Sequence, residues 1–345
     1  MTEEERIELE QARREIRIRQ ASIQLASKTN MKVSVVLVTY RRPDVLSCTI
    51  DQLLEQDYPN LEIIVVDSSP DAEQNYLHLS CARVGILTYI ISSVPYLGTV
   101  RNIGLLASTG ELVIFLDDDF YIDRDFVSRH AYLHNEDNVG QVRLVVGNSI
   151  ARPNEPVEWV KNANYHCPEG RYLSTINAGA GHYSVKRDAA LACGGFLPWV
   201  RLTGEETEFF GRLLQNGERA LNAKEIVAIH RVERKGGVRD DPNSISYHIA
   251  QRMADRVLTK LSLSRIAYLP FFIGGVTVRS IIAKEIFGAF SLKGVWELFF
   301  DFFWYSIYKA CDVRNPSSYF NSSLRMARPR LMCGSGFDVL RYQSK

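Results

Sequence analysis

Apolar runs alternate with helical patterns along the first third of the chain. The predicted strands are residues 33–38, 61–66, 86–92 and 112–116, and the predicted helices between them are residues 44–56 and 98–108. Three of these strands are almost continuously apolar, which is typical of parallel strands covered on both faces. The alternation of strands and helices predicts an open α/β sheet.

The pattern loosens beyond residue 140. Further strands are predicted near 142–151, 179–186 and 225–230, with a helix near 205–216. Residues 1–30 alternate acidic and basic side chains with sparse apolar ones, which favours a solvated helix or a frayed arm over a packed element. We therefore divide the chain into an N-terminal helical arm (1–30), an α/β domain (31–250) and a helical C-terminal region (251–345).

The charge of the chain is nearly balanced overall but uneven along its length. Lys and Arg number 41 and Asp and Glu 40, which argues against a nucleic-acid binder that relies on a basic surface. Residues 251–345 hold 14 Lys and Arg against 6 Asp and Glu, so this part is strongly basic and the remainder is acidic. The C-terminal region is expected to face a different partner.

The six cysteines do not form a C-x-x-C pair, so we expect buried thiols in a reducing cytosol and neither a zinc site nor a disulfide framework. The charged N-terminus lacks the apolar core of a signal peptide, and export is not expected.

Polar residues follow three of the predicted strands directly. They are Thr39 and Tyr40, then Asp67, and then Asp117, Asp118 and Asp119. Ligands of open α/β sheets bind beyond the carboxyl ends of the strands. Hard carboxylate oxygens at such an edge suit Mg²⁺ or Mn²⁺ when diphosphate oxygens and water complete the coordination. The alternative is a solvated acidic turn.

Six segments together resemble family 2 glycosyltransferases with the GT-A fold. They are residues 35–42 (VVLVTYRR), 60–67 (NLEIIVVD), 98–104 (GTVRNIG), 108–119 (STGELVIFLDDD), 193–196 (CGGF) and 204–209 (GEETEF). The resemblance covers roughly residues 31–235. It is specific because these segments occur in the same order as in the family. It implies an open mixed sheet flanked by helices, with a Rossmann-like nucleotide-binding half.

The resemblance also implies a role for each polar strand end. Thr39, Tyr40 and Arg41 would lie against the base and ribose, and Asp67 would hydrogen-bond the nucleobase. Arg101 would lie near the nucleotide, Asp117 would reach the ribose or the metal, Asp118 would line the donor site, and Asp119 would ligate the metal directly. As alternatives, Tyr40 is a packed aromatic, Asp67 a turn residue and Arg101 a surface cation.

The implied reaction transfers a sugar from a nucleotide diphosphate to an acceptor hydroxyl with inversion. Such a reaction requires a carboxylate that takes the hydroxyl proton. In the family this base follows another acidic residue at the start of a helix, and here that position is Glu206 in place of the common Asp. Glu205 is the alternative base, and a further alternative is that both residues only complement a helix N-terminus.

His230 ends the last predicted strand, where the family places a metal-binding or diphosphate-contacting histidine. An imidazole ligand would favour Mn²⁺ over Mg²⁺. A purely structural histidine is the alternative. Arg234 and Lys235, in the basic loop that follows, would contact the diphosphate when the loop closes.

The C-terminal region contains aromatic-rich runs that are interrupted by Arg279 and Asp301. Neither run is long enough to span a bilayer, whereas the mixture of basic and aromatic residues suits helices in an anionic membrane interface. A buried helical subdomain or a homo-oligomer interface is the competing interpretation.

Taken together, the sequence predicts a metal-dependent inverting glycosyltransferase that uses a UDP-sugar by default. Its expected acceptor is a lipid-linked or polysaccharide glycan, and its expected location is the inner face of the plasma membrane. A nucleotidyltransferase would need a Gly-rich triphosphate loop, and residues 39–43 do not form one. A non-catalytic nucleotide-sugar-binding scaffold protein is the other alternative.

Overall fold

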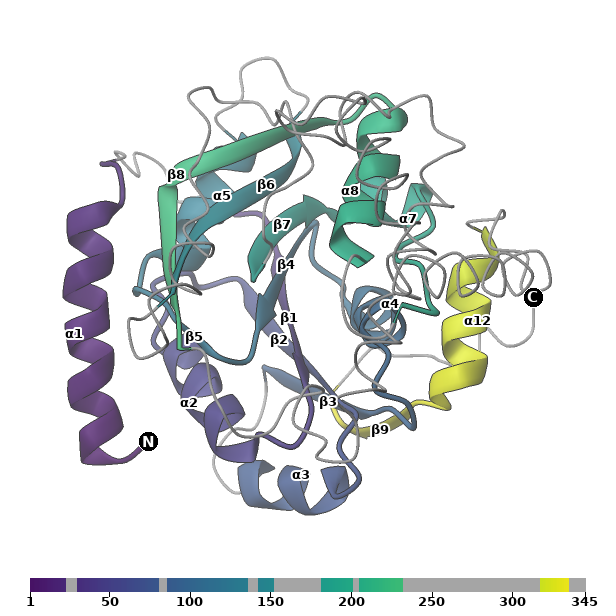
Figure 1. Ribbon diagram of the computed structural model, residues 1–345, viewed down its shortest axis with the longest axis horizontal. Helices are drawn as coiled ribbons and strands as arrows, with labels where there is room; N and C mark the ends of the chain where they lie inside the picture. The colour runs from purple at the N-terminus through teal and green to yellow at the C-terminus, as the bar shows by residue number, and fades with distance from the viewer. Residues whose placement is uncertain are drawn as a thin grey trace, which may run out of the picture.

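The computed structural model describes residues 1–22, 30–80, 86–135, 142–151, 181–200, 205–231 and 317–334. These residues form one mixed sheet in the order β5-β8-β6-β7-β4-β1-β2-β3-β9, with helices on both faces (Figure 1). The expected open α/β sheet is therefore confirmed.

Parallel strands form the centre of the sheet. They are β1 (Val33–Thr39), β2 (Leu61–Asp67), β3 (Leu87–Ile91) and β4 (Leu112–Asp117). The helices α2 (Pro43–Leu54), α3 (Ala72–Ser80) and α4 (Leu97–Ala107) connect them. All four predicted strands and both predicted helices of this half are present. The long apolar runs of the strands are buried on both faces of the sheet, which places these strands at its centre.

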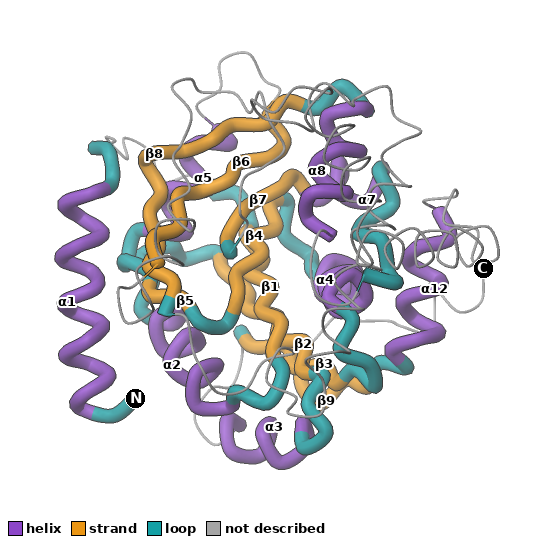
Figure 2. The backbone as a smooth tube through the Cα atoms, in the orientation of Figure 1, coloured by secondary structure: helices purple, strands orange, loops and turns teal. Residues whose placement is uncertain are grey.

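The other half of the sheet is mostly antiparallel. It contains β5 (Phe120–Tyr121), β6 (Val142–Ala151), β7 (His182–Lys186) and β8 (Arg219–His230), with the helices α5 (Phe126–Asn135), α7 (Arg187–Ala192) and α8 (Glu205–Gln215). Strand β8 begins six residues before the predicted start, since it also pairs in parallel with the first half of β6. The long course of β6 and β8 along each other is visible in Figure 2.

Side chains of the central strands alternate between two apolar clusters. Val33, Val35 and Leu37 pack with residues of α2, α3 and α5 on one face, whereas Val36 packs with residues of α4, α7 and α8 on the other. This two-sided burial explains why the strands read as continuous apolar runs.

The N-terminal arm is packed, which corrects the expectation of a solvated or frayed element. Helix α1 (Glu3–Arg19) stands beside β8 (Figure 1) and buries Leu9, Ala12 and Ile16 against Tyr121 and residues of β8. Leu9, Ala12 and Ile16 share one face of the helix, whereas Ile7 and Ile18 are exposed, so a small number of apolar residues forms a contact surface. The guanidinium of Arg13 is 1% exposed and lies 2.7 Å from Glu55.

Part of the C-terminal region belongs to the sheet domain, contrary to the prediction of a separate helical region. Helix α12 (Ser317–Ala327) packs on α4, and β9 (Arg330–Cys333) pairs antiparallel with β3 as an edge strand. The aromatic runs with Arg279 and Asp301 lie outside the described residues. Among the helices that are described, none combines the length and apolar character needed to cross a bilayer.

Candidate active site

The carboxyl ends of β1, β2 and β4 meet at one edge of the sheet. The register places Thr39 opposite Asp67 and Val38 opposite Asp117. The N–H of Ser68 donates to the Thr39 carbonyl at 3.1 Å and ties the first two strand ends together. The prediction that these polar residues share an edge is confirmed, because the strands are adjacent and parallel.

Arg42 holds two acidic side chains that follow β4. Its Nη1 lies 3.2 Å from Asp118 Oδ1 and 2.7 Å from Asp119 Oδ2, and the Thr39 hydroxyl donates to Asp118 Oδ2 at 2.6 Å. Burial and the Asp119 charge raise the pKa of Asp118. Burial also opposes ionisation of Asp119, but His230 and Arg42 hold the pKa of that carboxyl well below its ordinary value. Asp119 is therefore the carboxylate that stays ionised.

Asp119 and His230 are brought together by the short β5·β8 ladder. Phe120 pairs with His230 across the two strands, and the Arg231 N–H donates to the Asp119 carbonyl at 2.8 Å. His230 Nε2 lies 3.2 Å from Asp119 Oδ2. The two residues are far apart in sequence, and the ladder makes them neighbours.

This pair fits a divalent cation in part. Carboxylate oxygen and imidazole nitrogen are suitable donors for Mn²⁺, and the Arg42 guanidinium already supplies positive charge at the same Asp119 oxygen. Within the described residues, no three His, Cys, Asp or Glu side chains converge as a complete metal site. Asp117, predicted as a further ligand, pairs with Arg101, and its contact with a metal stays a prediction.

Arg101 connects the two sides of the site. Its Nη2 lies 3.0 Å from Asp117 Oδ1, and its Nη1 contacts Glu205 and lies 2.9 Å from Glu206 Oε1. The side chain is 3% exposed, which excludes the alternative of a surface cation. One guanidinium thus neutralises carboxylates from β4 and from the start of α8.

Glu205 and Glu206 differ sharply in their surroundings. The Glu205 side chain is completely buried, and burial together with the Glu206 charge raises its pKa well above the ordinary value. The Glu206 side chain is 20% exposed. A proton acceptor must be reached by its substrate, so the geometry favours Glu206 over Glu205 as the base.

Asp117 interacts with the charges of both Asp119 and Glu206. Desolvation and the charges of Asp119 and Glu206 raise the pKa of Asp117 to about 6, although the Arg101 charge lowers it. Its side chain remains 37% exposed. The Asp117 side chain is therefore accessible from the site and takes up a proton more readily than an ordinary aspartate.

Asp67, the predicted nucleobase contact, is engaged by the protein itself. Its carboxylate accepts from the Ser69 N–H at 2.7 Å, from Asn75 Nδ2 at 3.0 Å and from the Tyr89 hydroxyl at 2.5 Å, and the residue is fully buried. This hydrogen bonding shapes the loop after β2. A contact between Asp67 and a base stays a prediction.

Tyr40 and Arg41 lie at the open end of β1. Arg41 has a φ of 56°, its N–H donates to the Ser69 hydroxyl at 2.7 Å, and its guanidinium carbon lies 5.1 Å from the centre of the Tyr40 ring. The left-handed backbone turns the two side chains together. Both are accessible enough to line a ligand, since Tyr40 is half-buried and Arg41 exposed.

The sequence did not indicate roles for Arg42 and Phe120. Arg42 follows Arg41 within the segment that carries the family resemblance, so its position was a usable signal. Phe120 carried no such signal, because its neighbour His230 is distant in sequence. The predicted diphosphate contacts Arg234 and Lys235 lie outside the described residues.

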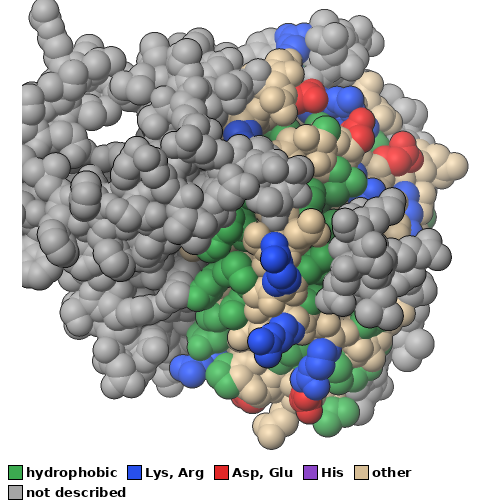
Figure 3. All heavy atoms as spheres, turned by 90° about the vertical axis from the view of Figure 1, so that its right-hand side faces the viewer, with side chains coloured by type: hydrophobic (Ala, Val, Ile, Leu, Met, Phe, Trp, Pro, Cys, Tyr) green, Lys and Arg blue, Asp and Glu red, His purple; other side chains and the backbone are tan. Residues whose placement is uncertain are grey.

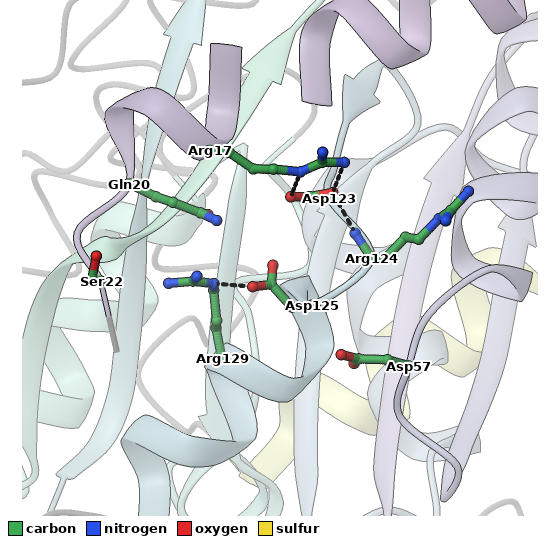
Figure 4. Close-up of a pocket in the computed structure, with 8 residues that line it drawn as sticks. All are labelled: Arg17, Gln20, Ser22, Asp57, Asp123, Arg124, Asp125 and Arg129. Atoms are coloured by element: carbon green, nitrogen blue, oxygen red, sulfur yellow. Dashed lines mark hydrogen bonds and ion pairs between the residues drawn. The ribbon is translucent and has the colours of Figure 1, made fainter. Parts of the chain in front are cut away.

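A separate pocket of about 530 Å³ opens between α1 and the start of α5 (Figure 4). Arg17 pairs with Asp123 at 2.8 Å and Arg129 with Asp125 at 2.7 Å, so these charges are already matched within the pocket. None of the predicted site residues lines it.

Comparison with known proteins extends the resemblance. Residues 34–196 match the model of the family "Glycosyl transferase family 2". A glucosyl-dolichyl phosphate glucuronosyltransferase of Haloferax volcanii is 29% identical over 190 residues, which cover 48% of this chain and 56% of that protein. The matched part spans only 22% and 16% of two other curated relatives.

Two solved structures share the architecture. The mannosyltransferase PcManGT from Pyrobaculum calidifontis, solved with GDP-Man and Mn²⁺, superposes with a TM-score of 0.55 at 17% identity, covering 92% of this chain and 86% of that one. S. aureus TarS 1-349 with UDP-GlcNAc gives 0.50 at 16% identity, covering 86% and 92%. Such low identities establish the fold alone. The described residues thus have the GT-A fold, and residues 34–196 of this chain belong to glycosyl transferase family 2.

Proposed function

We propose that the protein is an inverting glycosyltransferase that moves a sugar from a nucleotide diphosphate donor to an acceptor hydroxyl. The observation that carries the proposal is the Arg101 bridge between Asp117 on the donor side and the accessible Glu206. A transferase needs donor-binding groups and a base in one cleft, and this bridge supports that arrangement.

In the proposed reaction, Glu206 accepts the proton of the acceptor hydroxyl while that oxygen attacks the anomeric carbon from the face opposite the diphosphate. Arg101 orients the Glu206 carboxylate through its 2.9 Å contact. Burial raises the pKa of Glu205 well above its ordinary value, which disfavours a second negative charge beside Glu206. Thr39, Tyr40 and Arg41 line the base and ribose, and Asp118 anchors the loop that carries Asp119.

Asp119 and His230 would hold a divalent cation, with Mn²⁺ favoured by the imidazole. When bound, the cation offsets the negative charge that develops on the leaving diphosphate. The mannosyltransferase of this fold was solved with Mn²⁺, which makes Mn²⁺ the first metal to test.

The donor is proposed to be a UDP-sugar, with GDP-sugars as the second choice. Relatives of this fold were solved with UDP-GlcNAc and with GDP-Man, so both nucleotides enter the screen. The screen measures thermal shifts with UDP- and GDP-sugars in the presence of Mn²⁺, followed by a donor-hydrolysis assay on the hits. Donor binding with slow hydrolysis supports the enzyme, whereas binding without hydrolysis or transfer to any glycan acceptor would support the scaffold interpretation.

The acceptor is proposed to be a lipid-linked or polysaccharide glycan presented at an anionic membrane surface on the cytoplasmic side. Arg325, Arg328 and Arg330 are exposed in the described C-terminal part, and Leu331 is 40% exposed beside them. On the same side of the molecule, apolar side chains gather among Lys and Arg (Figure 3). Basic residues near an anionic surface contribute roughly 1 kcal/mol each, so such a face favours peripheral attachment.

Flotation with vesicles that contain anionic lipid tests the membrane proposal. The full chain should float at low salt, and the double change Arg325→Glu and Arg328→Glu should reduce the floating fraction. The matched control changes Arg14→Glu and Arg19→Glu on the exposed side of α1. Equal flotation of both variants, or none by the unmodified chain, would contradict attachment through this face.

A further inference from the structure

Three rings form a column that runs inward from the proposed metal-binding edge. The Phe120 ring lies parallel to the His230 imidazole, with centroids 4.8 Å apart and planes at 13°. The His182 ring meets Phe120 at 5.6 Å and 71°. We call His230, Phe120 and His182 the ring column. It links an accessible histidine to a fully buried one.

Gly181 and Gly147 lack a side chain, and rings of the ring column occupy the space that a side chain at these positions would fill. A Cβ atom at Gly181 would lie 2.0 Å from Cζ of Phe120, and one at Gly147 would lie 2.0 Å from Cε1 of His182. Any side chain at either position would push a ring out of the column. Both inner rings are therefore closely confined from the side of β6 and β7.

Confinement of Phe120 is nearly complete, since the residue is 1% exposed. His182 supports it from the interior without adding charge, because burial lowers the pKa of His182 to about 4. The outer ring differs, because the His230 side chain is 29% exposed and ends its strand. The orientation of the His230 ring therefore depends on the Phe120 ring against which it stacks.

We propose that Phe120 is a positioning residue that holds the His230 imidazole with Nε2 toward Asp119 and thereby sets the affinity of the cation that these two residues share. The inference rests on the proposed metal pair of Asp119 and His230. A ligand that is oriented before binding loses less freedom when the metal arrives. Stacking against a fixed ring supplies this orientation, and the register of β5 and β8 keeps the two rings opposite each other.

Binding of Mn²⁺ to the full chain, measured by electron paramagnetic resonance with UDP or GDP present, tests the proposal. Phe120→Leu should weaken Mn²⁺ binding roughly 10-fold, the scale expected for residues that orient a metal ligand. The matched control is Phe126→Leu. Phe126 is also 1% exposed and packs on His130 and His182, so its loss opens a similar cavity but keeps the Phe120 stack.

A double-mutant cycle separates positioning from general packing. His230→Phe keeps a ring in the stack but removes the metal ligand. In that background, Phe120→Leu should cause no further loss of Mn²⁺ affinity, because it acts only through His230. If Phe120→Leu does not fold, Phe120→Met preserves volume without the ring and takes its place in the cycle.

The outcomes separate the positioning role of Phe120 from the proposed metal pair of Asp119 and His230. Equal losses in Phe120→Leu and Phe126→Leu, or additive losses in the cycle, would overturn the positioning role and leave the proposed function intact. Absence of Mn²⁺ binding by the unmodified chain with either nucleotide would instead remove the proposed metal pair, and this inference with it.

Discussion

The guanidinium of Arg101 lies 2.9 Å from the carboxylate of Glu206, although the two residues are on helices from opposite halves of the chain. The same guanidinium contacts Asp117 and Glu205. Three acidic side chains thus share one buried cation, and the proposed base depends on a residue that also touches the donor side.

Loss of Arg101 should destabilise the protein and abolish transfer. Arg101→Met leaves the acidic groups of Asp117, Glu205 and Glu206 without their cation, and breaking a buried ion pair from one side costs about 3–5 kcal/mol. Acid protonates the carboxylates and relieves their repulsion. The deficit in melting temperature should therefore be smaller at about pH 5.5 than at about pH 7.5. A deficit that does not change with pH would argue that Arg101 acts through packing alone.

The two glutamates at the start of α8 should respond differently to the same substitution. Glu206→Gln cannot accept a proton, so transfer should fall by ~10² to 10⁴ while donor affinity survives. Glu205→Gln resembles the protonated form of a carboxyl whose pKa is already raised, so transfer should change little. Initial rates and donor titrations of both variants check this. The reverse result would identify Glu205 as the base.

Nucleotide diphosphate binding should depend on Asp119 and on a divalent cation together. Asp119→Asn removes the ionised oxygen that His230 and Arg42 contact. Calorimetry with UDP and with GDP should show a severe loss of Mn²⁺-dependent affinity in this variant. The unmodified chain should show a comparable loss in chelator. Unchanged affinity in both experiments would exclude the metal site.

Asp117 should make the stability of the metal-free protein depend on pH. Its pKa is raised from 3.8 to about 6 in the folded state, so its stabilising contribution is fully present below about pH 4 and is lost as the pH rises through about 6. Asp117→Asn removes that loss. In chelator, the melting temperature of the variant relative to the unmodified protein should rise between about pH 4 and pH 7.5. Asp188→Asn, at a side chain that is 68% exposed, is the control and should show no such trend.

The packing of α1 predicts a contrast between two isoleucines of that helix. Ile16 is fully buried against residues near the end of β8, whereas Ile18 is 85% exposed. Ile16→Ala should destabilise the protein by about 2–4 kcal/mol, and Ile18→Ala by less than about 0.5 kcal/mol. Denaturant unfolding measures both. Equal effects would mean that α1 is not held as the structure has it.

The sequence alone determined the central sheet and the positions of its polar ends. Runs such as 33–38 and 112–116 are apolar on both faces, and only a strand buried on both sides suits them. Since parallel neighbours end at the same edge, Thr39, Asp67 and Asp117 had to meet there.

The tertiary structure decided which of the polar residues act together. Whether Arg101 is a surface cation or a buried bridge, and which glutamate is accessible, depends on how α4 and α8 pack, and this is a long-range property. The same holds for α1 and β9, because a helix with few apolar residues and a four-residue edge strand acquire their places only from the surface they cover. The local sequence pattern indicates how much apolar surface a segment can bury. The segment against which it packs depends on the remainder of the chain.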